Sequence, residues 1–270
     1  MLVAVDAVLE AISSVPPSAL AFLAVVVLVA SALNTVAGAG SLLILPALIF
    51  SGLDASSANA TNRVGILVQT GAAILGFRRA GLSVGPVELR LTAVAMLGGL
   101  VGSWLATLLA PAQMQVAIVC AMGLVLVLTL LPRKPRAEGA PPPRDALPPP
   151  TLAMVAGFFC VGIYGGFLQA GVGILALLLL SRFFDTSLVA ANVVKVTATF
   201  GLTVVALAVF AARHEAIDPV RGAVLAASAA VGGFLGADLA VRVGEVWTRR
   251  VVVLAVVASM AKLLWDLVRH

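Results

Sequence analysis

The sequence predicts an all-α protein that crosses a membrane several times and is built from two similar halves. The chain of 270 residues is 61% apolar and only 11% charged, whereas soluble domains are about half apolar and about a quarter charged. Apolar runs of about 20 residues, the length of a helix that crosses the hydrocarbon layer, recur along the whole chain. These runs are continuous rather than alternating, which argues against a membrane β-barrel.

A proline-rich segment separates the two halves. Residues 132–150, with the sequence PRKPRAEGAPPPRDALPPP, hold eight of the fourteen prolines. Proline favours extended, semi-rigid backbone, and the Lys and Arg residues place this segment on the cytoplasmic side. We therefore predict a first membrane repeat over 1–131, a cytoplasmic linker over 132–150 and a second membrane repeat over 151–270.

Each half is expected to hold about five membrane segments in the same order. An apolar run leads into a glycine-rich break, a short apolar run follows the break, and three long helices complete the half. In the first half these segments cover about 18–35, 38–51, 57–77, 86–109 and 112–131. In the second half they cover about 151–167, 171–182, 187–210, 219–241 and 247–268.

The halves also share short motifs. GGLVGSWLA at 98–106 matches GGFLGADLA at 232–240, and LDASSANAT at 53–61 aligns with FDTSLVAAN at 184–192. If the short segments cross the membrane, each half has five crossings and the repeat is inverted, as in many secondary transporters. If they are re-entrant, each half has four crossings and the repeat is parallel. The distribution of Lys and Arg does not decide between the two, and we favour the inverted arrangement by analogy.

Two cations lie at nearly equivalent places inside the halves. Arg63 follows ANATN and Lys195 follows AANVV, each just after the short segment that comes after a glycine-rich break. Ionisable residues within membrane segments indicate a functional site, although a long cationic side chain near a helix end also reaches the headgroups.

The breaks themselves favour an anion site. A broken helix exposes N–H groups at the start of the next helix, where the helix dipole favours negative charge. Glycine at Gly38 and Gly40, or at Gly171 and Gly173, lets the backbone approach a ligand closely. The side chains expected to donate or relay hydrogen bonds there are those of Asn34, Thr35, Ser41, Thr61, Asn62, Gln169 and Asn192.

Other residues allow more than one interpretation. Asp238 is a coupling residue for protons, the partner of Lys195 or Arg63, or an acid near a cytoplasmic helix end beside Arg242. Gln69 and the threonines at 70, 197 and 199 either line a path or bond back to their own helix. The glycines at 98, 99, 102, 232, 233 and 236 are spaced for close helix packing, and Cys120 and Cys160 are expected to be small core residues.

These motifs resemble the sulfite exporter TauE/SafE family of membrane transporters. The resemblance lies in AGAGSLLILPALIFSGLDASSANATNR in the first half, in GGFLQAGVGILALLLLSRFFDTSLVAANVVK in the second half and in the proline-rich centre. It implies a multi-pass inner-membrane permease for sulfite, thiosulfate or an organosulfonate such as sulfoacetate. The glycine run is shorter here than is common in the family, and the family's site carries over loosely to Asn34, Gly38, Gly40, Thr61, Asn62, Gln169, Gly171 and Asn192.

The predicted function is therefore secondary transport of a small anion, and the protein is not expected to be an enzyme. No Walker loop for ATP is present, no His and Cys cluster has metal-ligand spacing, and we expect neither cofactor nor metal. The net charge of +5 reflects basic cytoplasmic loops and not nucleic-acid binding. The expected partners are a small anion and membrane lipid, homo-oligomerisation stays open, and the alternatives are another anion or a non-transporting membrane subunit.

Overall fold

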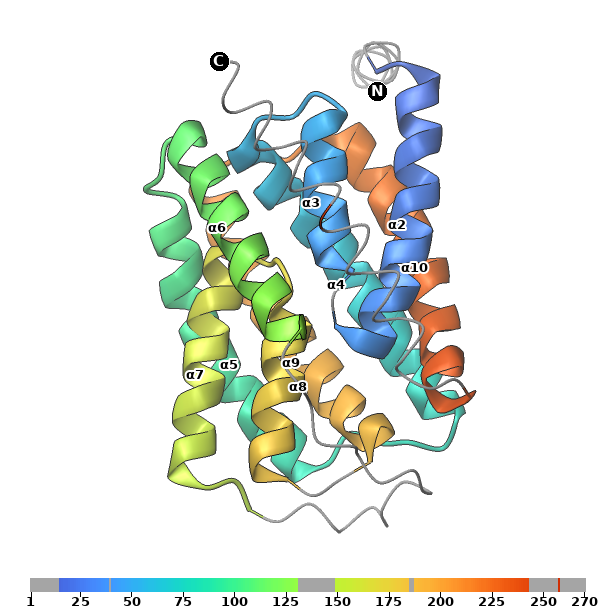
Figure 1. Ribbon diagram of the computed structural model, residues 1–270, viewed down its shortest axis with the longest axis vertical. Helices are drawn as coiled ribbons and strands as arrows, with labels where there is room; N and C mark the ends of the chain where they lie inside the picture. Colours follow the sequence, from blue (N-terminus) through green and yellow to red (C-terminus); the bar gives the residue numbers. More distant parts are fainter. Residues whose placement is uncertain (1–14, 39, 131–148, 185–186, 243–256, 258–270) are drawn as a thin grey trace.

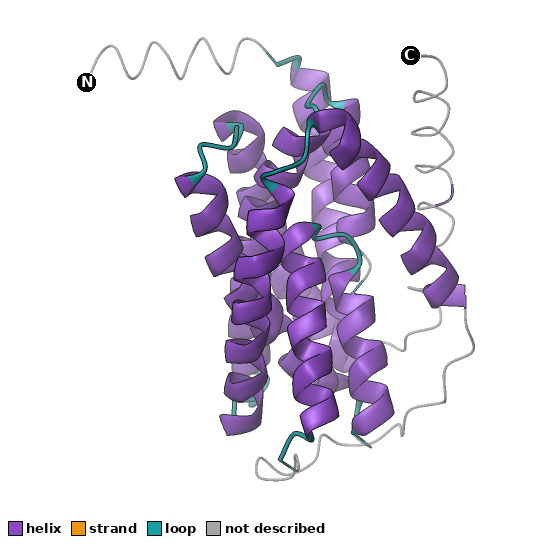
Figure 2. Cartoon of the chain, turned by 90° about the vertical axis from the view of Figure 1, so that its left-hand side faces the viewer, coloured by secondary structure: helices purple, strands orange, loops and turns teal. Residues whose placement is uncertain are grey.

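In the computed structural model, the described part of the chain is helical. The structure describes residues 15–38, 40–130, 149–184, 187–242 and 257. Figure 1 shows the helices side by side, each running roughly along the long axis of the protein. Figure 2 shows the same bundle of helices turned by 90°. The helices of the first half are α2 (Pro17–Ala37), α3 (Ser41–Phe50), α4 (Ala55–Arg79), α5 (Pro86–Ala106) and α6 (Pro111–Leu130), and those of the second are α7 (Leu152–Phe167), α8 (Val172–Phe183), α9 (Leu188–Ala212) and α10 (Pro219–Arg242).

Nine of the ten predicted segments lie in the described part, and each coincides with one of these helices to within a few residues. The agreement follows from local signals. Proline starts α5, α6 and α10, since its missing N–H has no partner in a first helical turn anyway. The tenth segment, 247–268, and nearly all of the 132–150 linker lie outside the described residues.

The short helices form hairpins with the helices before them. Leu23 and Val27 of α2 pack in one cluster with Ile44 and Leu48 of α3, so α3 runs back along α2. In the same way, the space beside Gly157 near the start of α7 is filled by Leu179 near the end of α8. At 10 and 12 residues, α3 and α8 are about 15 to 18 Å long, half of the hydrocarbon thickness. The short segments therefore return along α2 and α7, and the number of membrane crossings stays a prediction.

Glycines bring the remaining helices together across the two halves. A Cβ on Gly98 or Gly102 of α5 would overlap backbone oxygens of α7, and a Cβ on Gly232 of α10 would overlap one of α2. On their other sides, Gly99 contacts Leu202 of α9 and Gly233 contacts Gln69 of α4. The predicted packing role of these glycines is confirmed. The fourth helix of each half is thus wedged between the first and third helices of the other half.

The outer surface is apolar, as expected for lipid contact. Large side chains such as Phe22, Leu97 and Trp104 are exposed, and five described helices are long and apolar enough to cross a membrane: α2, α5, α6, α9 and α10. Cys120 and Cys160 are also exposed, so the prediction that they are core residues was wrong. Each lies on the outer side of a helix whose inner face carries the buried residues.

Candidate functional site

The tips of the two hairpins meet in the interior of the protein. Gly38 follows the last residue of α2 and Gly171 precedes the first residue of α8. Both glycines have positive φ, 77° and 69°, a conformation that other residues rarely adopt. The backbone of Gly38 lies directly against that of Gly173, where a side chain on either residue would clash. The N–H of Gly171 donates to Oγ of Ser41 at 2.9 Å. The glycine-rich segment after α2 and the one before α8 are therefore in direct contact.

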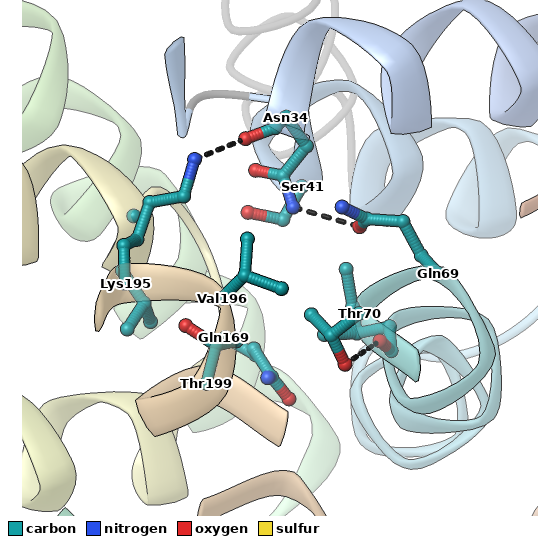
Figure 3. A pocket seen from close by; sticks show the side chains of 11 residues that line it. Asn34, Ser41, Gln69, Thr70, Gln169, Lys195, Val196 and Thr199 are labelled. Carbon is teal, nitrogen blue, oxygen red and sulfur yellow. Dashed lines mark hydrogen bonds between the residues drawn. The ribbon is translucent and has the colours of Figure 1, made fainter. Parts of the chain in front are cut away.

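A small polar cavity lies beside this contact. Its volume is about 10 Å³, close to the space of one water molecule. Figure 3 shows Lys195 on one side of the cavity, Gln69 and Thr70 on the other and Asn34 between them. The lining residues come from both halves: Asn34, Ser41, Ile66, Gln69, Thr70, Gln169, Val172, Gly173, Lys195, Val196 and Thr199.

Lys195 binds the C-terminal end of α2. Its Nζ donates to the backbone oxygens of Asn34 at 2.9 Å and Thr35 at 2.7 Å, and to Oδ1 of Asn192 at 2.7 Å. Nδ2 of Asn192 donates to the oxygen of Val36 at 3.1 Å. A helix end leaves carbonyl oxygens without partners and carries partial negative charge. A lysine and an asparagine of α9 thus compensate the buried end of α2.

Arg63 binds the C-terminal end of α7 in the corresponding manner. Its guanidinium donates to the backbone oxygens of Gly165, at 3.1 Å, and Gly166, and lies 4.4 Å from the centre of the Phe210 ring. Nδ2 of Asn59 donates to the oxygen of Phe167 at 3.0 Å. Arg63 is fully buried but does not line the cavity. It reaches the cavity through Gln169, whose Oε1 accepts from Nη1 at 3.2 Å.

Amide side chains connect the cavity wall to the helices around it. Nδ2 of Asn34 donates to Oε1 of Gln69 at 2.8 Å, and Nε2 of Gln69 donates to the hydroxyl of Thr35 at 3.1 Å. Oδ1 of Asn34 accepts from the N–H of Gly40 at 3.1 Å. On the other side, Nε2 of Gln169 donates to the hydroxyl of Thr203. Each hairpin is therefore fastened to the long helix of its own half by a buried amide.

A family model decides what kind of protein carries this arrangement. The model described as sulfite exporter TauE/SafE matches residues 23–263, nearly the whole chain. The chain belongs to the TauE/SafE family. Comparisons with curated proteins and with solved structures find no match.

Membership in the TauE/SafE family and five candidate spans make the chain a multi-pass membrane protein of a permease family. Helix α4, which supplies three of the lining residues, is not among the five spans although it is 25 residues long. Its low hydropathy has a clear cause. The buried side of α4 carries Asn59, Asn62, Arg63, Gln69 and Thr70, side chains that a lipid-facing helix would not hold.

Of the residues predicted for the anion site, Asn34, Ser41, Gln169 and Lys195 line the cavity. Gly38 and Gly171 lie at the edge of the cavity. Gly40, which immediately precedes α3, packs against the backbone of Ala30 in α2. Asn192 and Arg63 lie behind the wall and contact it through Lys195 and Gln169.

Three predicted residues lie elsewhere. The hydroxyl of Thr61 accepts from the N–H of Asp218, in the loop before α10, at 3.0 Å. Asn62 is fully buried but is not part of the cavity lining. Asp238 is exposed on α10 and does not line the cavity, so its role in coupling stays a prediction.

Some of the buried polar residues of α4 were not predicted from the sequence, because they follow a helical periodicity rather than a recognisable motif. Residues 59, 62, 63, 66, 69 and 70 follow the three- and four-residue spacing of one helix face, and this face of α4 meets the cavity and the end of α7. Asn59 is the clearest omission, since it stands four residues before Arg63 as Asn192 stands three before Lys195. Thr70 and Thr197 do bond back to their own helices, at 2.7 Å and 2.8 Å, and Thr70 also lines the cavity.

Proposed function

We propose that the protein is a secondary transporter that moves a small sulfur-containing anion, such as sulfite, thiosulfate or an organosulfonate like sulfoacetate, across the inner membrane. The anion binds in the cavity between the tips of the α2–α3 and α7–α8 hairpins. Support for this class of substrate comes from the family and from the chemistry of the cavity wall.

One observation carries the proposal: the N-terminal ends of two helices and a buried lysine converge on the same cavity. Ser41 is the first residue of α3, and Val172 and Gly173 are the first two of α8, and all three line the cavity with Lys195. The first N–H groups of a helix have no partner within it, and together with the dipole they favour an anion. Among the lining residues there is a cation, several amides and hydroxyls and no carboxylate.

The described conformation is closed around the site. A cavity of about 10 Å³ has room for about one water molecule, so an oxyanion needs the hairpin tips to separate. The amides of Asn34 and Gln69, which bond each other at 2.8 Å, are the groups whose rearrangement would widen the cavity on the α4 side. Binding would exchange these internal hydrogen bonds for bonds to the anion.

We also propose that the two halves are an inverted repeat. α4 and α9 are both 25 residues long, and their first residues, Ala55 and Leu188, stand 133 positions apart. The same offset relates Asn59 to Asn192, and each of these asparagines donates to the end of the first helix of the other half. Two hairpins that enter from opposite sides and meet at their tips are the arrangement by which such repeats give alternating access.

Flux of labelled thiosulfate and sulfoacetate into proteoliposomes tests the transport function. We expect Lys195→Met to reduce flux at least tenfold, because the site loses the cation of its wall. Asn192→Leu is the matched control. It removes a donor to the same end of α2 and a contact of Lys195 but keeps the charge, so it isolates the loss of helix capping.

If Lys195→Met and Asn192→Leu reduce flux equally at equal protein levels, the lysine acts only as a helix cap and the anion site is wrong. If wild-type protein moves none of the anions tested, the transport function itself is wrong. Size-exclusion chromatography with light scattering on the same preparations determines the oligomeric state, which stays a prediction.

A further inference from the structure

Unpaired polar atoms concentrate on one face of α4. In the described part of the chain, six buried side-chain nitrogen and oxygen atoms lack a hydrogen-bond partner, and five of them belong to four residues of this helix. These residues, which we call the α4 stripe, are Ser56, Asn59, Asn62 and Arg63. The unpaired atoms are Oγ of Ser56, Oδ1 of Asn59, both amide atoms of Asn62 and Nε of Arg63.

The α4 stripe leads from the end of the helix to the cavity. Its members are three, six and seven residues beyond Ser56 and therefore share one helix face. Over these residues α4 rises by about 10 Å. Ser56 is in the first turn, next to the exposed Asp54 that caps the helix, and Arg63 at the other end contacts Gln169 in the cavity wall.

Asn62 is the most unusual residue of the stripe. It is fully buried, and neither its carbonyl oxygen nor its NH2 group has a partner. One turn further along the helix, Ile66 lines the cavity. Buried polar groups in proteins are almost always bonded to protein or to ordered water, and inside a membrane no lipid can take the place of water. An amide in this position therefore needs water or a ligand.

The corresponding part of α9 differs. At the offset of 133 residues that relates the two helices, Asn62 corresponds to Lys195, and Asn59 corresponds to Asn192. Lys195 and Asn192 form hydrogen bonds with each other and with the end of α2. The polar groups on that face of α9 therefore have partners within the protein. Within the α4 stripe, hydrogen bonds to the end of α7 are made by the guanidinium of Arg63 and by Nδ2 of Asn59, while the amide of Asn62 has no such partner.

We propose that the α4 stripe is the wall of a hydrated route along which the anion and its water pass between the start of α4 and the central cavity, and that Asn62 binds the passing anion. The inference rests on the proposed transport function and adds a path to it, on which it places Asn62, a residue that the sequence predicted for the anion site. The NH2 group of Asn62 donates to an oxyanion, and its carbonyl oxygen accepts from water that accompanies the ion.

Cysteine labelling tests the route without measuring transport. In a chain whose exposed Cys120 and Cys160 are replaced by alanine, Ser56→Cys and Asn62→Cys are each treated with a small charged methanethiosulfonate reagent. Membranes are opened so that the reagent reaches both faces. Val64→Cys is the matched control, since Val64 lies at the same depth but faces Gly222 of α10. The labelling is repeated with sulfoacetate, because sulfite itself reacts with the reagent.

We expect both route positions to react at least tenfold faster than Val64→Cys, and sulfoacetate to slow the reaction at Asn62→Cys. Equal rates at positions 62 and 64 would overturn the route, whatever the transport assay gives. Fast labelling without protection by sulfoacetate would overturn the role of Asn62 in binding an anion.

Asn62→Leu supplies a second measurement that does not depend on thiol chemistry. Leucine has a similar size and removes an unpaired amide, so we expect an unchanged or higher melting temperature together with at least a fivefold loss of flux. A lower melting temperature would mean that Asn62 stabilises the fold through a structural water, which contradicts the proposal. Absence of flux in the wild-type protein would instead count against the transport function, while the labelling result would still stand.

Discussion

Lys195 and Arg63 perform the same local task with different consequences for the site. Each compensates the buried C-terminal end of the first helix of the other half. The lysine is part of the cavity wall, whereas the arginine lies behind Gln169 and under the ring of Phe210. The planar guanidinium can bind several carbonyl oxygens in a fixed geometry, while the flexible ammonium can exchange one partner for another. Under the proposed transport function, Lys195 contacts the anion and Arg63 positions Gln169.

At the surface, Glu215 in the loop between α9 and α10 makes stability depend on pH. Partial burial raises the pKa of this carboxyl, the charge of Asp54 raises it further, and Arg213 opposes the shift. The folded state thus holds the proton more tightly than the unfolded state, so the folded protein loses stability as the pH rises through the raised pKa. We expect Glu215→Gln to raise the melting temperature at pH 7 and to leave it unchanged near about pH 4, where glutamate is largely protonated in both states.

Thermal melting of the wild-type and Glu215→Gln proteins in detergent, across this pH range, measures the effect. An equal gain at both pH values would show that the substitution acts through packing and not through the charge of the carboxylate.

Between elements, the close contacts of α5 and α10 depend on the absence of side chains. At Gly102 a Cβ would overlap the carbonyl oxygen of Ile163, a backbone atom that cannot rotate away. The helices approach closely enough for backbone to contact backbone, which is how small residues bring membrane helices together. The same contacts set the position of α7, and α7 in turn carries the second hairpin tip.

Gly102→Ala should therefore destabilise the protein by about 1–3 kcal/mol, the usual cost of overpacking. Gly222→Ala in α10 is the matched control, because its Cβ would meet only the side chains of Thr61 and Val64 at 4.0 Å. There alanine should stabilise the helix by up to about 1 kcal/mol. Thermal unfolding of both variants in the same detergent compares them, and a stable Gly102→Ala protein would contradict the close packing of α5 on α7.

In the whole molecule, each half completes the other. α5 lies between α7 and α9, and α10 lies between α2 and α4. The cations and asparagines also act across the halves, since Lys195 binds α2 and Arg63 binds α7. A half by itself would leave a buried helix end without its cation and a glycine face without its partner helix.

Fragments 1–140 and 141–270, produced as separate chains, should each fail to accumulate as folded protein. Produced together they should associate, because the contacts between the halves do not need the linker. A tag on one fragment should then purify both in equal amounts, with a single cooperative melting transition. Stable, monomeric folding of either fragment alone would contradict this view of the fold.

The sequence by itself determined the membrane class and the nine described helices, because apolar length and proline act locally along the chain. Four of the residues predicted for the anion site, Asn34, Ser41, Gln169 and Lys195, line one cavity, and their role in binding an anion stays a prediction. Asn59 could have been added from the helical spacing of α4, whereas the outward position of Cys120 could not be read from a uniformly apolar run.

Only the tertiary structure decided how these parts act together. The short helices turn back as hairpins, and Lys195 reaches the oxygen of Asn34, 161 residues before it. Such contacts depend on which helix faces lie against each other. The choice of faces depends in turn on glycines in α5 and α10 that pack closely against helices of the other half. Composition and spacing carry no information about these partners, because the partner of a buried cation is chosen by the packing of distant helices and not by its neighbours in the chain.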